Sequence, residues 1–153
     1  MKIRTIAAWG GTALLAFTLA ACSSLRNNIP TPPAPATCVL PSGVQTQLLY
    51  PIPGATAVPD APQQIVFAIS SPLPNWGAAV LPSASPGIYG AAFQTITAGQ
   101  VPTPSATPSF ASPIYVSSAL PGSLPPNSLI AVFLNNLASN CSPVTAAASF
   151  TTQ

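Results

Sequence analysis

The sequence predicts an all-β domain built as a sandwich or a barrel. Short apolar runs rich in β-branched and aromatic residues alternate with Pro, Gly, Ser and Asn along most of the 153 residues, as in proteins made of many short strands. Pro occurs 21 times, and an interior Pro removes a hydrogen bond from a helix and clashes with its preceding turn. Hydrophobic residues make up 48% of the chain and charged residues 3%. Disordered chains have low hydrophobicity and high net charge, and this sequence has the reverse composition. Its length allows one folded domain.

Residues 1–21 have the pattern of a secretory signal peptide. Lys2 and Arg4 form a basic start, and residues 5–21 are uncharged and largely apolar. As a helix this stretch would span about 25 Å, which is less than the roughly 30 Å of a bilayer core. A permanent transmembrane helix is therefore the less favoured alternative. We expect the segment to be cleaved from the mature protein.

The apolar stretch ends in Leu19, Ala20, Ala21 and Cys22, which resembles the lipobox of bacterial lipoproteins. The resemblance implies cleavage before Cys22 and attachment of lipid chains, palmitate among them, to this residue. Two or three chains hold a protein firmly at a membrane, whereas one chain binds only marginally. By the sorting rule of this family, Ser23 favours the outer membrane in a Gram-negative envelope; in a Gram-positive one the anchor would lie in the cell membrane. The alternative is an ordinary signal peptide cleaved nearby.

Residues 22–37 are expected to form a tether. After Cys22 the sequence is polar and then rich in Pro and Ala, a composition that favours extended polyproline conformations. At about 3.1 Å per residue, such a segment reaches roughly 45 Å. It would hold the domain predicted for residues 38–153 clear of a membrane surface.

Seven strands are expected in this domain, separated by turn signals such as Pro-Gly and Pro-Pro-Asn. The stretch 98–113, with the sequence AGQVPTPSATPSFASP, is expected to be a long connection. The regular spacing of short strands favours a sandwich or barrel. The expected strands are residues 46–50, 64–70, 78–81, 88–96, 114–118, 128–135 and 147–152.

Two stretches resemble bacterial immunoglobulin-like domains, which are close in architecture to fibronectin type III modules. Residues 50–59 have the sequence YPIPGATAVP, and residues 124–132 have the sequence LPPNSLIAV, followed by a terminal ASFTT. The resemblance implies a seven-stranded immunoglobulin-like sandwich in which Leu124 closes the core and Ile130, Val132 and Leu134 point inward. Ile130 stands where this family often has a tyrosine, so the hydroxyl bond of a tyrosine corner would be absent.

Cys38 and Cys141 remain as an even pair once Cys22 carries lipid. In an exported protein, such a pair predicts a disulfide. The proposed sandwich would bring the start of the first strand and the last loop to the same pole, with Cα atoms within about 7 Å. Two free thiols, or thiols that pair with a partner, are the alternatives.

Catalytic and metal-binding groups are scarce in this sequence. The chain has no His, and its one acidic residue is Asp60, so neither a catalytic triad nor a pair of catalytic carboxylates can be assembled. Two Cys without His or carboxylate partners do not complete a metal site. Arg26 alone makes no nucleic-acid surface. The sequence therefore predicts a protein that is not an enzyme, with no cofactor and no nucleic-acid partner.

The remaining function is recognition without charge. Our leading interpretation is a lipid-anchored cell-envelope protein with a structural or protein-interaction role. The alternative is a lipoprotein that binds a small ligand or a glycan through Trp76 or the tyrosines, since aromatic groups suit uncharged partners. Trp76 can pack in the core or contact a ligand from a loop tip. An enzyme is the third and least favoured class.

Overall fold

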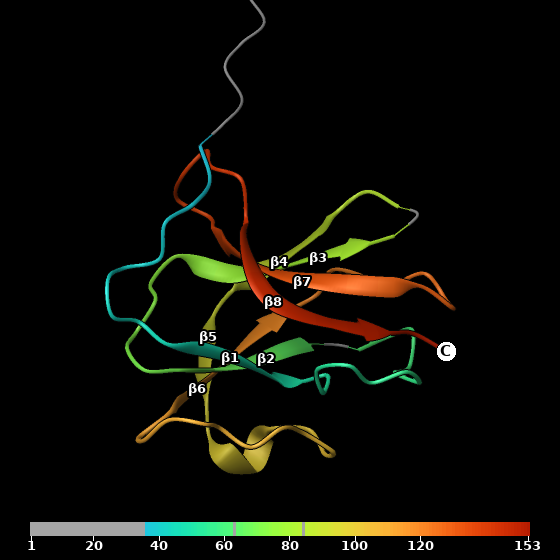
Figure 1. Cartoon of the computed structure of the whole chain (residues 1–153), viewed down its shortest axis with the longest axis horizontal. Helices are drawn as coiled ribbons and strands as arrows, with labels where there is room; N and C mark the ends of the chain where they lie inside the picture. Colours follow the sequence, from blue (N-terminus) through green and yellow to red (C-terminus); the bar gives the residue numbers. More distant parts are fainter. Residues whose placement is uncertain (1–35, 63, 84) are drawn as a thin grey trace, which may run out of the picture. The chain divides into compact units, whose positions relative to one another are not determined.

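The computed structural model describes residues 36–62, 64–83 and 85–153. All of them belong to the second of two units into which the chain divides, Ala34–Gln153. The predicted signal peptide, the lipobox with Cys22, and the tether up to residue 35 lie outside the described residues. The described part is all-β, with two antiparallel sheets of four strands each (Figure 1).

Each sheet brings together strands that are distant in the sequence. The first sheet has the order β1-β2-β6-β5 and the second has the order β4-β3-β7-β8. A single turn of 3-10 helix, η1, covers Ala98–Gln100. The first sheet consists of β1 (Thr46–Tyr50), β2 (Gln64–Ile69), β6 (Ile114–Ala119) and β5 (Gln94–Ile96). The second consists of β4 (Ile88–Ala92), β3 (Trp76–Pro82), β7 (Leu129–Asn136) and β8 (Val144–Thr151).

The described residues form eight strands, where the sequence predicts seven. The difference lies in residues 88–96, which were expected as one strand and form two, β4 in the second sheet and β5 in the first. The chain crosses between the sheets at Phe93, whose N–H donates to the carbonyl of Trp76 at 2.7 Å. The ring of Phe93 packs edge-on against Phe67, with centroids 5.7 Å apart. The other six predicted strands are found, β1 with the predicted bounds and the remaining five with shifts of up to three residues at their ends.

The main core lies between the two sheets. Ile65, Phe67 and Ile69 of β2 alternate with residues of the opposite face, as expected for side chains on a pleated strand. From the second sheet, Ile130, Val132 and Leu134 are fully buried in the same cluster, and Leu124 closes it. The inward positions that the resemblance implies for these four residues are confirmed.

β4 contains a bulge opposite β3, and a side chain of the first sheet bonds to backbone groups on both strands there. Gly77 pairs with Ala92 and Ala79 with Tyr89, so two residues of β4 stand opposite one residue, Ala78. Ser118 of β6 fills the gap: its hydroxyl accepts from the N–H of Ala78 at 3.0 Å and donates to the carbonyl of Ala91 at 2.6 Å. A Cβ on Gly90 would lie 2.3 Å from this hydroxyl oxygen. The bulge, the glycine and the serine therefore depend on one another.

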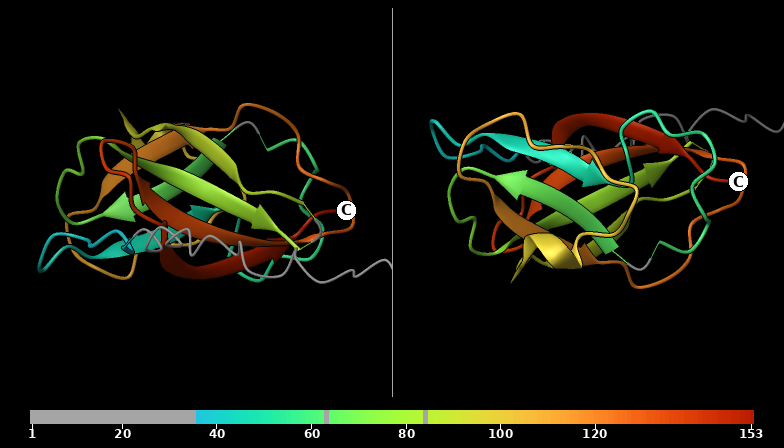
Figure 2. Two further views of the ribbon diagram at one scale, coloured as in Figure 1. Left: turned by 90° about the horizontal axis from the view of Figure 1, so that it is seen from above. Right: turned by 90° about the horizontal axis from the view of Figure 1, so that it is seen from below.

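The long connection 97–113 covers the outer face of the first sheet. Val101, Ala106 and Phe110 pack against a second, smaller core of Leu49, Val66 and Ala68. Figure 1 shows this segment, in yellow to orange, on the side of the first sheet that faces away from the second, and the view from below in Figure 2 shows it again. Hydrogen bonds hold it along β1. The N–H of Ala106 donates to the carbonyl of Leu49 at 2.9 Å, and the side-chain amide of Gln47 donates to the carbonyl of Thr107 and accepts from the N–H of Ser109.

A threonine closes the corner before β7. The hydroxyl of Thr152 donates to the carbonyl of Pro125 at 2.7 Å and accepts from the N–H of Ser128 at 2.9 Å. Thr152 is buried, so these bonds are shielded from water. Thr152, the residue after β8, therefore bonds two backbone groups of this corner through one hydroxyl.

Ser118→Ala should lower the free energy of unfolding by about 1–3 kcal/mol, because it leaves the buried N–H of Ala78 without a partner and removes the bond to the carbonyl of Ala91. Urea unfolding followed by circular dichroism measures this loss. Ser117→Ala is the matched control, since Ser117 precedes Ser118 and its side chain points to the opposite face of β6. Equal losses for the two variants would contradict the role assigned to Ser118.

Candidate functional site

The outer face of the second sheet is the candidate site. It is formed by the outward side chains of β3, β4 and β7, which we call the open face: Ala79, Leu81, Tyr89, Leu129, Ala131 and Phe133. Leu81, Tyr89 and Leu129 are 45%, 54% and 54% exposed. They are three of the five large hydrophobic side chains that are exposed among the described residues. Figure 2, left, shows β3 and β7 facing the viewer.

Two hollows flank Leu81 on this face. One, of about 160 Å³, lies among Leu81, Tyr89, Phe133 and Pro143. The other, of about 340 Å³, is lined by residues at the ends of β3 and β7, including Leu129 and Ala131. The open face therefore carries both protruding and hollowed apolar surface.

The open face carries no charge. In the part of the chain that the structure describes, Asp60 is the one residue with a charged side chain, and it lies exposed in the segment between β1 and β2, where its carbonyl accepts from the N–H of Leu124. The described residues contain no cluster of three or more His, Cys, Asp or Glu. Tyr89 supplies a phenolic hydroxyl on the face, and Ser83 and Ser85 line the larger hollow. This chemistry supports neutral recognition.

Trp76, a candidate ligand contact from the sequence, lies at the start of β3 and is only 4% exposed. It packs with the main core, so the structure favours its core interpretation. Tyr50 and Tyr115 pack beside the small core under the 97–113 segment. Tyr89 is exposed. Of the aromatic side chains that the sequence proposes as contacts, Tyr89 is the one that presents more than half of its surface to solvent.

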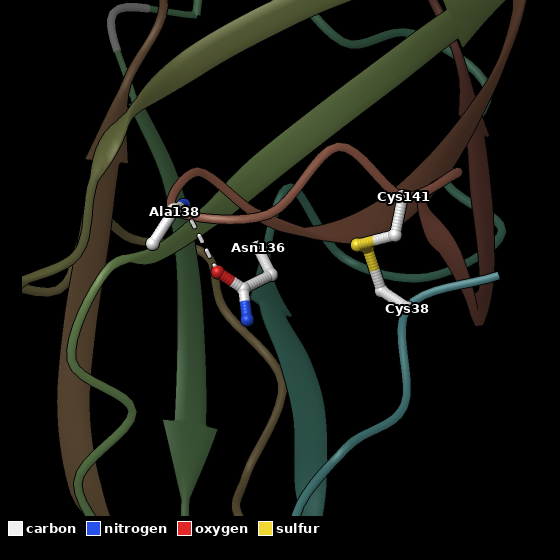
Figure 3. The surroundings of a disulfide bond; sticks show 4 residues. All are labelled: Cys38, Asn136, Ala138 and Cys141. Carbon is white, nitrogen blue, oxygen red and sulfur yellow. Dashed lines mark hydrogen bonds between the residues drawn. A yellow bond between two sulfur atoms is a disulfide. The ribbon is translucent and has the colours of Figure 1, made fainter. Parts of the chain in front are cut away.

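Cys38 and Cys141 form a disulfide with Cα atoms 5.1 Å apart (Figure 3), as the pairing argument predicts. Hydrogen bonds extend the connection: Cys38 N–H donates to the carbonyl of Ser142 at 2.7 Å, and Ser142 N–H donates to the carbonyl of Ala36 at 2.9 Å. Nearby, the side-chain oxygen of Asn136 accepts from the N–H of Ala138 at 3.0 Å and fixes the turn after β7. The beginning of the domain is therefore joined to the loop between β7 and β8.

The open face was not among the sites predicted from the sequence. One signal was present: β3 and β7 have the sequences WGAAVLP and LIAVFLNN, which are apolar at almost every position. A strand with one solvent-facing side usually alternates between apolar and polar residues. When two neighbouring strands carry apolar residues on both of their faces, the pattern indicates that both faces of the sheet are buried.

Removing the disulfide by Cys38→Ala and Cys141→Ala together should lower the free energy of unfolding by up to about 4–5 kcal/mol, the chain-entropy value for a loop of about a hundred residues. Urea unfolding of the double variant measures the change. Cys22→Ala is the control, since it leaves the bridge in place. A double variant as stable as the control would show that the bridge contributes nothing.

No family model, curated protein or solved structure matches this chain. Among the described residues, no helix is long and apolar enough to cross a bilayer. The function is therefore argued from the geometry of the described domain and from the motifs of the sequence.

Proposed function

We propose that this protein is a non-enzymatic, lipid-anchored cell-envelope module with an immunoglobulin-like domain, and that it binds another protein through its open face. The carrying observation is the contrast between the two sheets. The outer face of the first sheet is covered by the chain's own residues 97–113, while the equivalent face of the second exposes Leu81, Tyr89 and Leu129. Exposed apolar surface of this kind marks interaction sites on soluble domains.

The strand order supports the immunoglobulin-like assignment. With the strands lettered along the chain, the first sheet has the order A-B-E-D and the second has the order C′-C-F-G, if β4 is strand C′. Immunoglobulin-like sandwiches combine an A-B-E-D sheet with a C-F-G sheet, to which some add C′. The crossing at Phe93 then corresponds to the passage from strand C′ to strand D.

The anchoring proposal rests on the sequence motif at Cys22, with the segment up to residue 37 as a tether. Its support from the described domain is the way the chain enters: Thr37 pairs with Ser142, and the next residue is disulfide-bonded. A covalent bond and backbone hydrogen bonds suit a point at which tension from a membrane would reach the domain. Ser23 would direct the protein to the outer membrane of a Gram-negative cell.

A small-ligand or glycan site is the second candidate, supported by the hollow in which Tyr89 and Phe133 meet. Its volume of about 160 Å³ is below the roughly 300–1,000 Å³ of typical ligand pockets. The second hollow, of about 340 Å³, is large enough but has no aromatic side chain in its lining. A protein partner uses shallow relief more readily, because its affinity comes from many contacts spread over a surface. The geometry therefore supports a protein partner more strongly than a small ligand.

Lipidation is tested by metabolic labelling with radioactive palmitate. The wild-type chain should incorporate label and fractionate with membranes, and Cys22→Ala should lose both properties. Cys38→Ala serves as the control that removes a different cysteine. Equal labelling of wild type and Cys22→Ala would refute the anchor.

The interaction role is tested by photo-crosslinking in intact cells. A benzoylphenylalanine placed at Tyr89 should capture a defined protein, because this side chain is 54% exposed on the open face. The same group at Gln94 is the control, since Gln94 is exposed on β5 of the other sheet. Capture from Gln94 and none from Tyr89 would contradict the proposed surface.

A further inference from the structure

The molecule itself shows how an apolar outer sheet face can be covered. Residues 101–110, with the sequence VPTPSATPSF, lie over the first sheet without adding a regular strand or an α-helix. Three side chains, Val101, Ala106 and Phe110, contact the small core. The residues between them are Pro, Thr and Ser, and none is charged.

Proline-rich segments suit this task for a physical reason. Pro lacks a backbone N–H, so a segment that contains several can lie on apolar surface with fewer donors to satisfy. Each Pro also fixes one backbone dihedral angle before binding, which lowers the entropy cost of ordering the segment. Peptide segments of this type dock in shallow grooves lined by aromatic side chains.

The open face offers matching chemistry. Tyr89 and Phe133 provide aromatic surface beside Leu81, and Pro143 lies at the rim of the same hollow. A charged side chain brought onto this face would meet no opposite charge, since Asp60 is the one charged side chain of the described residues and lies outside the face. Burying an unpaired charge is costly, so the partner segment must be uncharged where it makes contact.

We propose that the open face binds an uncharged, proline-rich segment of a partner protein, much as residues 101–110 cover the first sheet. The inference rests on the interaction role proposed above and names the chemistry of the partner. Leu81 lies between the two hollows and is the central contact. Tyr89 flanks it and offers both a ring face and a hydroxyl.

A segment of this chain has the same chemistry as the proposed partner, and the experiment must distinguish the two. Residues 29–34, IPTPPA, match residues 101–106, VPTPSA, at four of six positions and replace Val by Ile at a fifth. The chain thus contains a second segment of the required chemistry. If this segment filled the open face, a partner segment would be unable to bind.

The test uses the full chain in phosphatidylcholine nanodiscs and a fluorescent peptide with the sequence VPTPSATPSF. Fluorescence anisotropy should show saturable binding to the wild-type chain. Leu81→Asn should weaken it about three- to tenfold, since fully burying an exposed leucine contributes about 1.5–3 kcal/mol, Leu81 is 45% exposed before binding, and 1.4 kcal/mol is tenfold. Leu137→Asn is the matched control, because Leu137 is 43% exposed against 45% for Leu81 and lies outside the open face. A peptide with its three prolines changed to alanine should bind more weakly.

Three outcomes would overturn the proposal. The first is no saturable binding to the wild-type chain, or equal effects of Leu81→Asn and Leu137→Asn. The second is binding that appears only when Pro30, Pro32 and Pro33 are changed to Ser, which would identify the chain's own segment as the occupant. The third is a dimer in analytical ultracentrifugation that Leu81→Asn dissociates, which would identify a second copy.

The cellular crosslinking experiment separates this proposal from the function on which it rests. A protein captured from Tyr89 that contains no proline-rich segment would overturn the proposed partner chemistry and leave the interaction role in place. A captured protein whose crosslinked peptide is uncharged and proline-rich would support both. Absence of any capture from Tyr89, together with absence of peptide binding, would remove both.

Discussion

The connection between the two sheets at Ser118 and Phe93 determines how the rest of the domain is arranged. The hydroxyl of Ser118 satisfies the bulge in β4, and the chain then crosses to the first sheet through Phe93. Because of this crossing, β5 joins β6, with Ile96 paired to Tyr115. Neighbouring antiparallel strands need only two to five residues between them. The connection 97–113 is far longer than the pairing requires, and the surplus covers the outer face of the first sheet.

The domain achieves its internal polar contacts almost without charge. Ser118 and Thr152 each bond to backbone groups from distant parts of the chain, and no buried side-chain polar atom of the described residues lacks a partner. Hydroxyl groups can donate and accept at once, so one side chain completes two backbone bonds. An uncharged surface follows from the same composition, and on such a surface the proposed partner would be recognised by shape and apolar contact.

The sequence predicted the parts of the fold that depend on local pattern. Six of the seven expected strands, the inward residues Ile130, Val132 and Leu134, and the pairing of Cys38 with Cys141 agree with the structure. The division of residues 88–96 was missed, since each half has the composition of a strand and the crossing depends on contacts of Phe93 with Trp76 and Phe67. The open face was missed for a related reason. Whether Leu81 and Tyr89 are covered depends on where residues 97–113 lie, which is set by packing and not by local sequence.

The size of the open face bears on the kind of interaction it can support. Its exposed apolar surface is concentrated in three side chains, Leu81, Tyr89 and Leu129. A standard stable interface buries roughly 800 Å² per partner and involves about 20–30 residues on each side. A free domain with such a face would bind weakly. Attachment to a membrane changes this, because tethering raises the effective concentration of two partners that share a surface and so strengthens their association without new contacts. The proposed anchor and the proposed open-face interaction therefore support each other: a small, uncharged face is sufficient for a protein that is held beside its partner.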